Sequence, residues 1–180
     1  MKMTPLNIGL FVGALLLGVA LYFVVPSLGL LLFPLLVVFV VVILLRNKSG
    51  EKADPAQTAE AMTMMPAEGK ARIYVMRKGF VGGQQGMNIT INDDLNSQIR
   101  TKYFLMAEVE PGTHTVTAQM SSGTKGSARS HEITLEANKS VLLDMKLQMG
   151  AVQGKPDFTE VRDMVEAKSM LNGLKLVLWK

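Results

Sequence analysis

The sequence predicts an N-terminal hairpin of two transmembrane helices, followed by an all-β sandwich, mostly antiparallel, with one short C-terminal helix. Three observations predict it. The run Met3–Leu45 has no charged side chain, the hydrophobic pattern past Lys70 repeats every two residues, and helical spacing returns only at Val161–Leu171. The expected domains are a hairpin, a flexible linker and a sandwich, over residues 1–46, 47–69 and 70–180.

The uncharged run is too long for one membrane span and suits two. As a single helix rising about 1.5 Å per residue it would reach roughly 65 Å, against a hydrocarbon core of about 30 Å. The segment Pro26–Gly29 breaks the run, so we place the spans near 6–25 and 30–45. A cleaved signal peptide is the alternative for the first segment, but its apolar run exceeds the usual length of about 7–15 residues.

Positive charges flank the predicted hairpin on both sides. Lys2 precedes it, and Arg46, Lys48 and Lys52 follow it. Because Lys and Arg resist translocation, both flanks should lie in the cytoplasm. The sequence thus predicts a multi-pass membrane protein with the lipid bilayer as one partner and the polar domain in the cytoplasm. If the second span fails to cross, the polar domain lies on the opposite side.

Gly9 and Gly13 form a pair of small residues, four apart, on one face of the first predicted span. Such pairs let helices approach closely. This helix-packing face can therefore join copies of the chain, or it can pack the first span against the second.

The linker prediction rests on two prolines and few branched apolar residues, with a short helix over Ala56–Met64 as the alternative. Met62, Met64 and Met65 offer soft sulfur ligands for copper, but no Cys or His lies beside them and Pro66 interrupts the run. Ordinary packing or contact with a membrane surface is the favoured role for these methionines.

The sandwich prediction rests on alternating apolar and polar residues between turn signals. Pro111-Gly112 suits a type II turn, in which the glycine supplies a positive φ, and Asn172-Gly173 is a natural stop for the helix predicted near Val161–Leu171. The predicted strands lie near 71–77, 87–91, 102–109, 113–119, 130–136, 140–149 and 174–178.

Three segments resemble a bacterial family of envelope domains of unknown function that is often found on lipoproteins. They are Gly69–Arg77, Tyr103-Phe104 with Pro111–His114, and Glu136–Leu143, so the resemblance covers about 69–175. The Pro-Gly-x-His hairpin is shared with PEGA-type sandwiches. The resemblance implies a small envelope β-sandwich with no assigned reaction, and it makes the predicted membrane the bacterial inner membrane. Lipoprotein members lie outside that membrane, which favours a periplasmic domain as the alternative.

Composition argues against several kinds of site. The chain has no Cys, which excludes disulfides, thiolate metal sites and a Cys nucleophile. Its basic residues are scattered, so we expect no nucleic-acid binding. His114 and His131 lack the His-x-x-x-His spacing, and Gly79–Gly86 lacks the Gly-Lys-Ser/Thr ending of a phosphate loop. We therefore expect no metal and no cofactor, and the sequence identifies no small-molecule substrate.

The leading expectation is a membrane-anchored, non-enzymatic module that binds a protein partner, self-associates or acts as an envelope scaffold. Trp179 beside Lys180 suits an anchor at a membrane interface, with an edge strand packed on the sandwich as the alternative. The predicted partner-contact loop contains Phe80, Val81, Gln84 and Gln85.

Two other functions stay open. An enzyme acting on an envelope component would use exposed carboxylates such as Asp93, Asp94 or Asp144. A structural subunit of a membrane oligomer would instead assemble through the face of Gly9 and Gly13.

Overall fold

The computed structural model describes most of the chain from residue 50 onward and parts of the segment before it. The chain divides into two compact units, Met1–Asn47 and Lys48–Lys180. The described residues are 12–13, 16–20, 23, 33–42, 50–79, 85–121, 128–148 and 154–180.

The described part of the first unit is helical, and its longest stretch is 33–42. Among the described residues, no helix combines the length and the apolar character needed to cross a membrane. This finding contradicts the predicted transmembrane hairpin over 6–25 and 30–45, and with it the multi-pass inner-membrane location.

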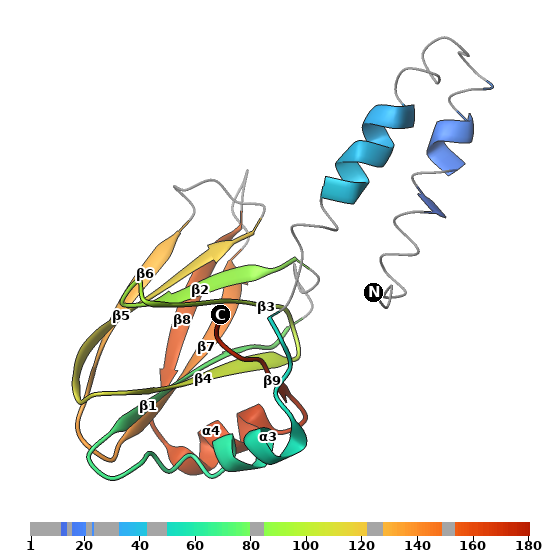
Figure 1. The fold of residues 1–180 in the computed structure, drawn as a ribbon. Helices are drawn as coiled ribbons and strands as arrows, with labels where there is room; N and C mark the ends of the chain where they lie inside the picture. The colour runs from blue at the N-terminus through green and yellow to red at the C-terminus, as the bar shows by residue number, and fades with distance from the viewer. Residues whose placement is uncertain are drawn as a thin grey trace. The chain divides into compact units, whose positions relative to one another are not determined.

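The second unit is built on two β-sheets that pack face to face (Figure 1). The five-stranded sheet has the order β8-β7-β1-β4-β9, and the four-stranded sheet has the order β3-β2-β5-β6. The strands are β1 Ala71–Arg77, β2 Met87–Ile91, β3 Leu95–Ile99, β4 Tyr103–Val109, β5 Gly112–Met120, β6 Arg129–Leu135, β7 Ser140–Gln148, β8 Lys155–Val161 and β9 Lys175–Leu176.

The five-stranded sheet is mixed, whereas the sequence predicts a mostly antiparallel sandwich. β1 pairs antiparallel with β4 but parallel with β7, and β4 pairs parallel with β9. Parallel neighbours need a long crossover connection, and here the chain visits the other sheet between β1 and β7. The fold is therefore all-β, with one mixed sheet, one antiparallel sheet and short helices. The prediction is wrong for the mixed sheet and for the number of helices.

Alternate residues of the facing strands form the core between the two sheets. Ile73 and Val75 on β1 pack in this core with Ile89 on β2 and Val116 on β5, and all four are fully buried. Because strand side chains alternate between faces, the same period that predicts the strands also selects this core. Each large aliphatic side chain buried there contributes about 1.5–3 kcal/mol.

Two short helices, α3 (Pro55–Ala61) and α4 (Met164–Leu171), cover the outer face of the five-stranded sheet (Figure 1). Tyr74 and Leu142 of the sheet form a second core with Leu171 of α4. Both faces of β1 are therefore covered, and all seven of its residues are buried. The sequence predicts the C-terminal helix of this pair, and it gives the other helix only as the alternative to a flexible linker.

Residues 50–69 belong to the folded unit, although the sequence predicts a flexible linker there. Asp54 caps α3, and Gln57 completes a capping box with the Asp54 backbone. Upstream of the helix, Lys52 forms an antiparallel bridge with Val177 near the C-terminus. The short helix that is the alternative for this segment is the arrangement observed.

α4 ends where the sequence predicts. The Asp163 carboxylate accepts hydrogen bonds from the backbone N–H groups of Val165 and Glu166, at 2.8 and 2.9 Å, and so caps the first turn. Beyond the last turn Gly173 has a φ of 78°, the left-handed conformation that commonly ends a helix.

Candidate functional site: a groove between α3 and α4

A groove of about 680 Å³ lies between the chain that follows α3 and one side of α4. Residues 62–65 form the first wall. The second wall contains Met164, Val165, Lys168, Ser169 and Asn172. The lining is mostly apolar, and its one charged side chain is that of Lys168.

The exposed large apolar side chains of the second unit, as far as its residues are described, all lie in this groove. The exposed fraction is 72% for Met65, 39% for Met164 and 81% for Val165. Single exposed apolar side chains are ordinary, but three that come together from segments far apart in the sequence form a patch. We call this set, with the residues around it, the α3–α4 groove.

The first wall depends on a reversal of the chain after α3. Met64 has a positive φ of 59°, and its side chain is only 1% exposed. The Ser140 hydroxyl donates to the Met64 carbonyl over 2.9 Å, which ties this wall to β7. Pro66 then disfavours a helical conformation for Met65. As a result, the adjacent side chains of Met64 and Met65 differ in exposure, at 1% and 72%.

The second wall follows from the periodicity of α4. Ala167 and Leu171, four residues apart, are buried against the sheet at 1% and 0% exposure. Met164 and Lys168, also four residues apart, share a different side of the helix and line the groove. The side of α4 that faces the groove is therefore partly apolar, in addition to the side that packs on the sheet.

An ionic cluster holds α3 on the sheet. Arg72 on β1 is 6% exposed, and its guanidinium pairs with Glu60 on α3 and with Glu108 on β4, where Nε lies 3.1 Å from Oε2. Burial alone opposes the charged form, but the hydrogen bonds to these carboxylates outweigh it and raise the pKa of Arg72. The backbone N–H of Ala67, together with Arg72, lowers the pKa of Glu108. The cluster thus fixes the helix that carries the first wall.

A second groove, of about 380 Å³, lies beside the start of α3 and β9. Its charged lining residues are Lys52 and Lys175, and no carboxylate lines it. The Lys52 ammonium also lies 5.8 Å from the centre of the Tyr103 ring, a cation–π contact. Both grooves beside α3 therefore contain basic charges and no acidic ones.

The two histidines lie apart and have separate roles. On β5, Nδ1 of His114 lies 2.8 Å from the Asn92 amide nitrogen, and its Nε2 lies 2.8 Å from the Glu110 carbonyl. An amide N–H donates and a carbonyl accepts, so Nδ1 is the acceptor and Nε2 is the donor in these two contacts. On β6, His131 contacts Glu160. Within the described ranges, no group of three or more His, Asp or Glu side chains could hold a metal ion.

The predicted partner-contact loop is described at one position. Gln85 is exposed, and its carbonyl accepts a hydrogen bond from Nη1 of Arg77 at 2.6 Å. The other three residues, Phe80, Val81 and Gln84, lie outside the described residues.

The predicted helix-packing pair is also described in part. Gly13 is exposed, and a Cβ atom there would meet open space, whereas Gly9 lies outside the described residues. Within the first unit it is Gly18 that is buried, and a Cβ there would lie 2.5 Å from the Phe33 ring.

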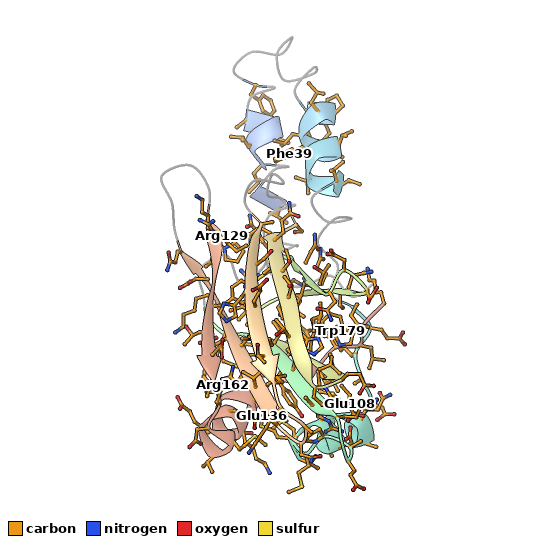
Figure 2. All side chains as sticks on the ribbon, turned by 90° about the vertical axis from the view of Figure 1, so that its left-hand side faces the viewer. Phe39, Glu108, Arg129, Glu136, Arg162 and Trp179 are labelled. Carbon is orange, nitrogen blue, oxygen red and sulfur yellow. The ribbon has the colours of Figure 1, made fainter. Side chains whose placement is uncertain are left out.

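Trp179 packs on the core between the sheets, at the position labelled in Figure 2. Its indole nitrogen donates to the carbonyl of Met106 over 2.7 Å, and the ring is half-buried. This is the packed edge arrangement that the sequence leaves open beside a role at a membrane interface.

The three carboxylates considered for an enzyme do not meet in one site. Asp93 and Asp94 are exposed in the turn between β2 and β3. Asp144 lies on β7 in the other sheet and is 4% exposed, so its predicted exposure is wrong. Neither of the two grooves beside α3 has any of them in its lining.

Residues 67–156, half of the chain, match the family DUF2846, described as protein of unknown function. The chain belongs to the DUF2846 family. This result confirms the predicted resemblance to a family of domains of unknown function, while its PEGA-like and lipoprotein aspects stay predictions. No curated protein matches the chain.

The α3–α4 groove lies outside the part that matches DUF2846. The match contains β1 to β7 and the beginning of β8, whereas the two walls come from residues 62–65 before it and 164–172 after it. The methionine run and the helix are each visible in the sequence. Their meeting is not, because it depends on contacts between opposite ends of the folded unit.

Proposed function

We propose that this DUF2846 protein is a non-enzymatic interaction module that binds a protein partner through the α3–α4 groove. One observation carries the proposal, namely that the exposed large apolar side chains described in the folded unit, Met65, Met164 and Val165, gather in a single concave site. Covering such side chains gives about 25 cal/mol per Å² of apolar surface removed from water. A partner that fills the groove therefore gains affinity without any rearrangement of the core.

The edge strands β8 and β6 are poorer binding surfaces than the groove. β8 begins with Lys155 and Pro156, and an edge proline cannot donate to an added strand. β6, the edge of the other sheet, has exposed Arg129 and Glu132. Charges and prolines on edge strands oppose pairing with another chain, so strand addition is disfavoured here.

The methionine content of the groove suits binding to a protein surface. Methionine has three rotatable bonds and a polarisable sulfur, and it adapts its shape to a partner at low cost. Residues 62–65 supply three methionines and α4 supplies Met164.

Site-specific photo-crosslinking in the native cells tests the proposal. A photoreactive amino acid at Val165, which is 81% exposed, should give a discrete protein adduct of defined mass. The matched control is the same amino acid at Glu132, which is exposed on β6. An adduct that contains a second copy of the chain would identify the partner as the protein itself. No adduct at Val165, or the same adducts at both positions, would contradict the proposal.

A further inference from the structure

We infer that the segment bound in the α3–α4 groove is an amphipathic helix of the partner, with carboxylates beside its apolar face; this rests on the proposed function. The inference concerns the chemistry of the partner, which the apolar patch alone leaves open. Two features bear on this chemistry, namely the charges that line the grooves and the concave form of the site.

The charged side chains that line the two grooves are all lysines. Lys168 is the charged residue of the α3–α4 groove, and Lys52 and Lys175 are those of the neighbouring groove. The chain has 15 Asp and Glu, yet neither groove has one in its lining. A partner with carboxylates next to its apolar side chains would pair with these lysines, whereas a basic partner would be repelled. Charge complementarity of this kind selects a partner more than it adds affinity.

The shape of the site favours a helix over a flat surface. A volume of about 680 Å³ lies between the two walls, so the site is concave. Amphipathic helices fill such grooves with side chains at i, i+3 or i+4, and i+7. A bilayer surface would contact the exposed tips of Met65 and Val165 and leave the space between the walls unfilled.

Lys168 lies at the edge of the apolar patch, so the ion pair with a carboxylate of the partner would form there. Lys168 lies in the last turn of α4, one turn beyond Met164 along the same side. An acidic residue one turn from an apolar anchor on the partner helix would therefore reach it. The geometry requires a carboxylate spaced three or four residues from a large apolar side chain, and a purely apolar segment does not meet this requirement.

Two synthetic peptides of about 18 residues, a length at which isolated helices begin to be stable, test the inference. Both have the same leucine stripe, one flanked by Glu and the other by Lys. The full chain, labelled with ¹³C at its methionine methyl groups, is titrated with each peptide and followed by NMR. The Glu peptide should shift the methyl signals of Met62, Met65 and Met164 in a saturable way. The signals of Met76 and Met87, fully buried elsewhere, should stay in place.

Charge reversal at the groove provides the decisive comparison. Lys168→Glu should weaken binding of the Glu peptide by about tenfold or more, which corresponds to about 1.4 kcal/mol, and should strengthen binding of the Lys peptide. Lys155→Glu is the matched control, because Lys155 is exposed at the start of β8 and its reversal changes the net charge equally. In that variant the preference for the Glu peptide should persist.

Several outcomes would overturn the inference. They are equal shifts with both peptides, no shifts with either, or shifts produced only by vesicles of phosphatidylglycerol, which would assign the groove to a membrane surface. The proposed function fails separately, through the absence of an adduct at Val165 in cells. An adduct at Val165 without any preference between the peptides would leave the interaction module standing and remove the acidic helix.

Discussion

Nε2 of His131 lies 2.7 Å from Oε1 of Glu160, and this contact joins the edge strands of the two sheets, β6 and β8. Because an ionised carboxylate only accepts hydrogen bonds, Nε2 is the donor. Arg162, labelled in Figure 2, binds the other carboxylate oxygen at 2.8 Å and donates to the Thr134 carbonyl on β6 at 3.3 Å. Side chains therefore close this side of the sandwich, where no backbone pairing joins β6 to β8.

Removal of the charge at Glu160 should destabilise the fold in a pH-dependent way. Burial alone would raise the pKa of this carboxyl, but the hydrogen bonds from His131 and Arg162 outweigh it and lower the pKa. A group with a lowered folded-state pKa stabilises the fold above its unfolded pKa and loses this effect as the pH falls through the folded value.

We therefore expect Glu160→Gln to lower the free energy of unfolding by about 1 kcal/mol at neutral pH. The difference from the wild type should shrink below the ordinary glutamate pKa of 4.5, as measured by urea unfolding at several pH values. Glu132→Gln on β6 is the matched control and should change little at any pH. Equal stability of wild type and Glu160→Gln at neutral pH would show that the contact does not hold the sheets.

Tyr74→Phe tests how α3 is attached to β1. The Tyr74 hydroxyl, fully buried, donates to the carbonyl of Ala61 in the last turn of α3 at 2.8 Å. Loss of this hydrogen bond should cost about 1 kcal/mol, because the Ala61 carbonyl keeps its bond from the Met64 N–H. Tyr103→Phe, at a half-buried position, should cost less.

The same hydroxyl predicts a loss of stability in alkali. Burial raises the pKa of Tyr74, and the neighbouring Arg72 offsets part of this increase. A raised folded-state pKa stabilises the fold below the unfolded pKa of 10.0, and this contribution disappears as the pH rises through the folded value. The stability advantage of wild type over Tyr74→Phe should therefore decrease above about pH 10. A constant difference across this range would contradict the assignment.

The sequence predicts the regular part of the fold and misses its irregular strands. The predicted strands 71–77 and 87–91 coincide with β1 and β2, because branched apolar residues occupy alternate positions in both, such as Ile73 and Val75 in β1. β3 is missed because Ser97 and Gln98 are polar, although both are buried, with Ser97 donating to the Leu178 carbonyl at 2.9 Å. β8 is missed because Pro156 argues against a strand, and only its edge position makes the proline tolerable.

The site is less predictable than the fold, for a physical reason. Met65 and Val165 become neighbours only after α3 and α4 pack on the same face of the sheet, a contact that no local pattern encodes. The small residues of α3 give no strong periodic signal, so the sequence does not show where this helix packs. The length and composition of the uncharged run likewise predicted spans over 6–25 and 30–45, whereas no helix among the described residues is long and apolar enough to cross a membrane.

Adjacent substitutions in the turn between β2 and β3 should have opposite effects. Asn92 and Asp93 both have a positive φ, of 51° and 61°. Asn92 also accepts a hydrogen bond from the Thr115 N–H at 3.0 Å and contacts His114. Asn92→Ala should therefore cost about 1–3 kcal/mol. Asp93→Gly should be neutral or stabilising by up to about 1 kcal/mol, since glycine adopts this φ freely. Similar losses at both positions in thermal unfolding would contradict this division.

The last prediction separates the groove from the core beneath it. Leu171 and Val165 lie on the same helix, but Leu171 is 0% exposed in the outer core, whereas Val165 is 81% exposed. Leu171→Ala should lower the free energy of unfolding by about 2–5 kcal/mol, since it leaves a cavity under α4. Val165→Ala should stay within about 0.5 kcal/mol of wild type. Denaturant unfolding of the full chain can follow Trp179, the single tryptophan, which packs on the core between the sheets. If Val165→Ala destabilised the fold as much as Leu171→Ala, the valine would be part of the core, and the groove would no longer be a surface available to a partner.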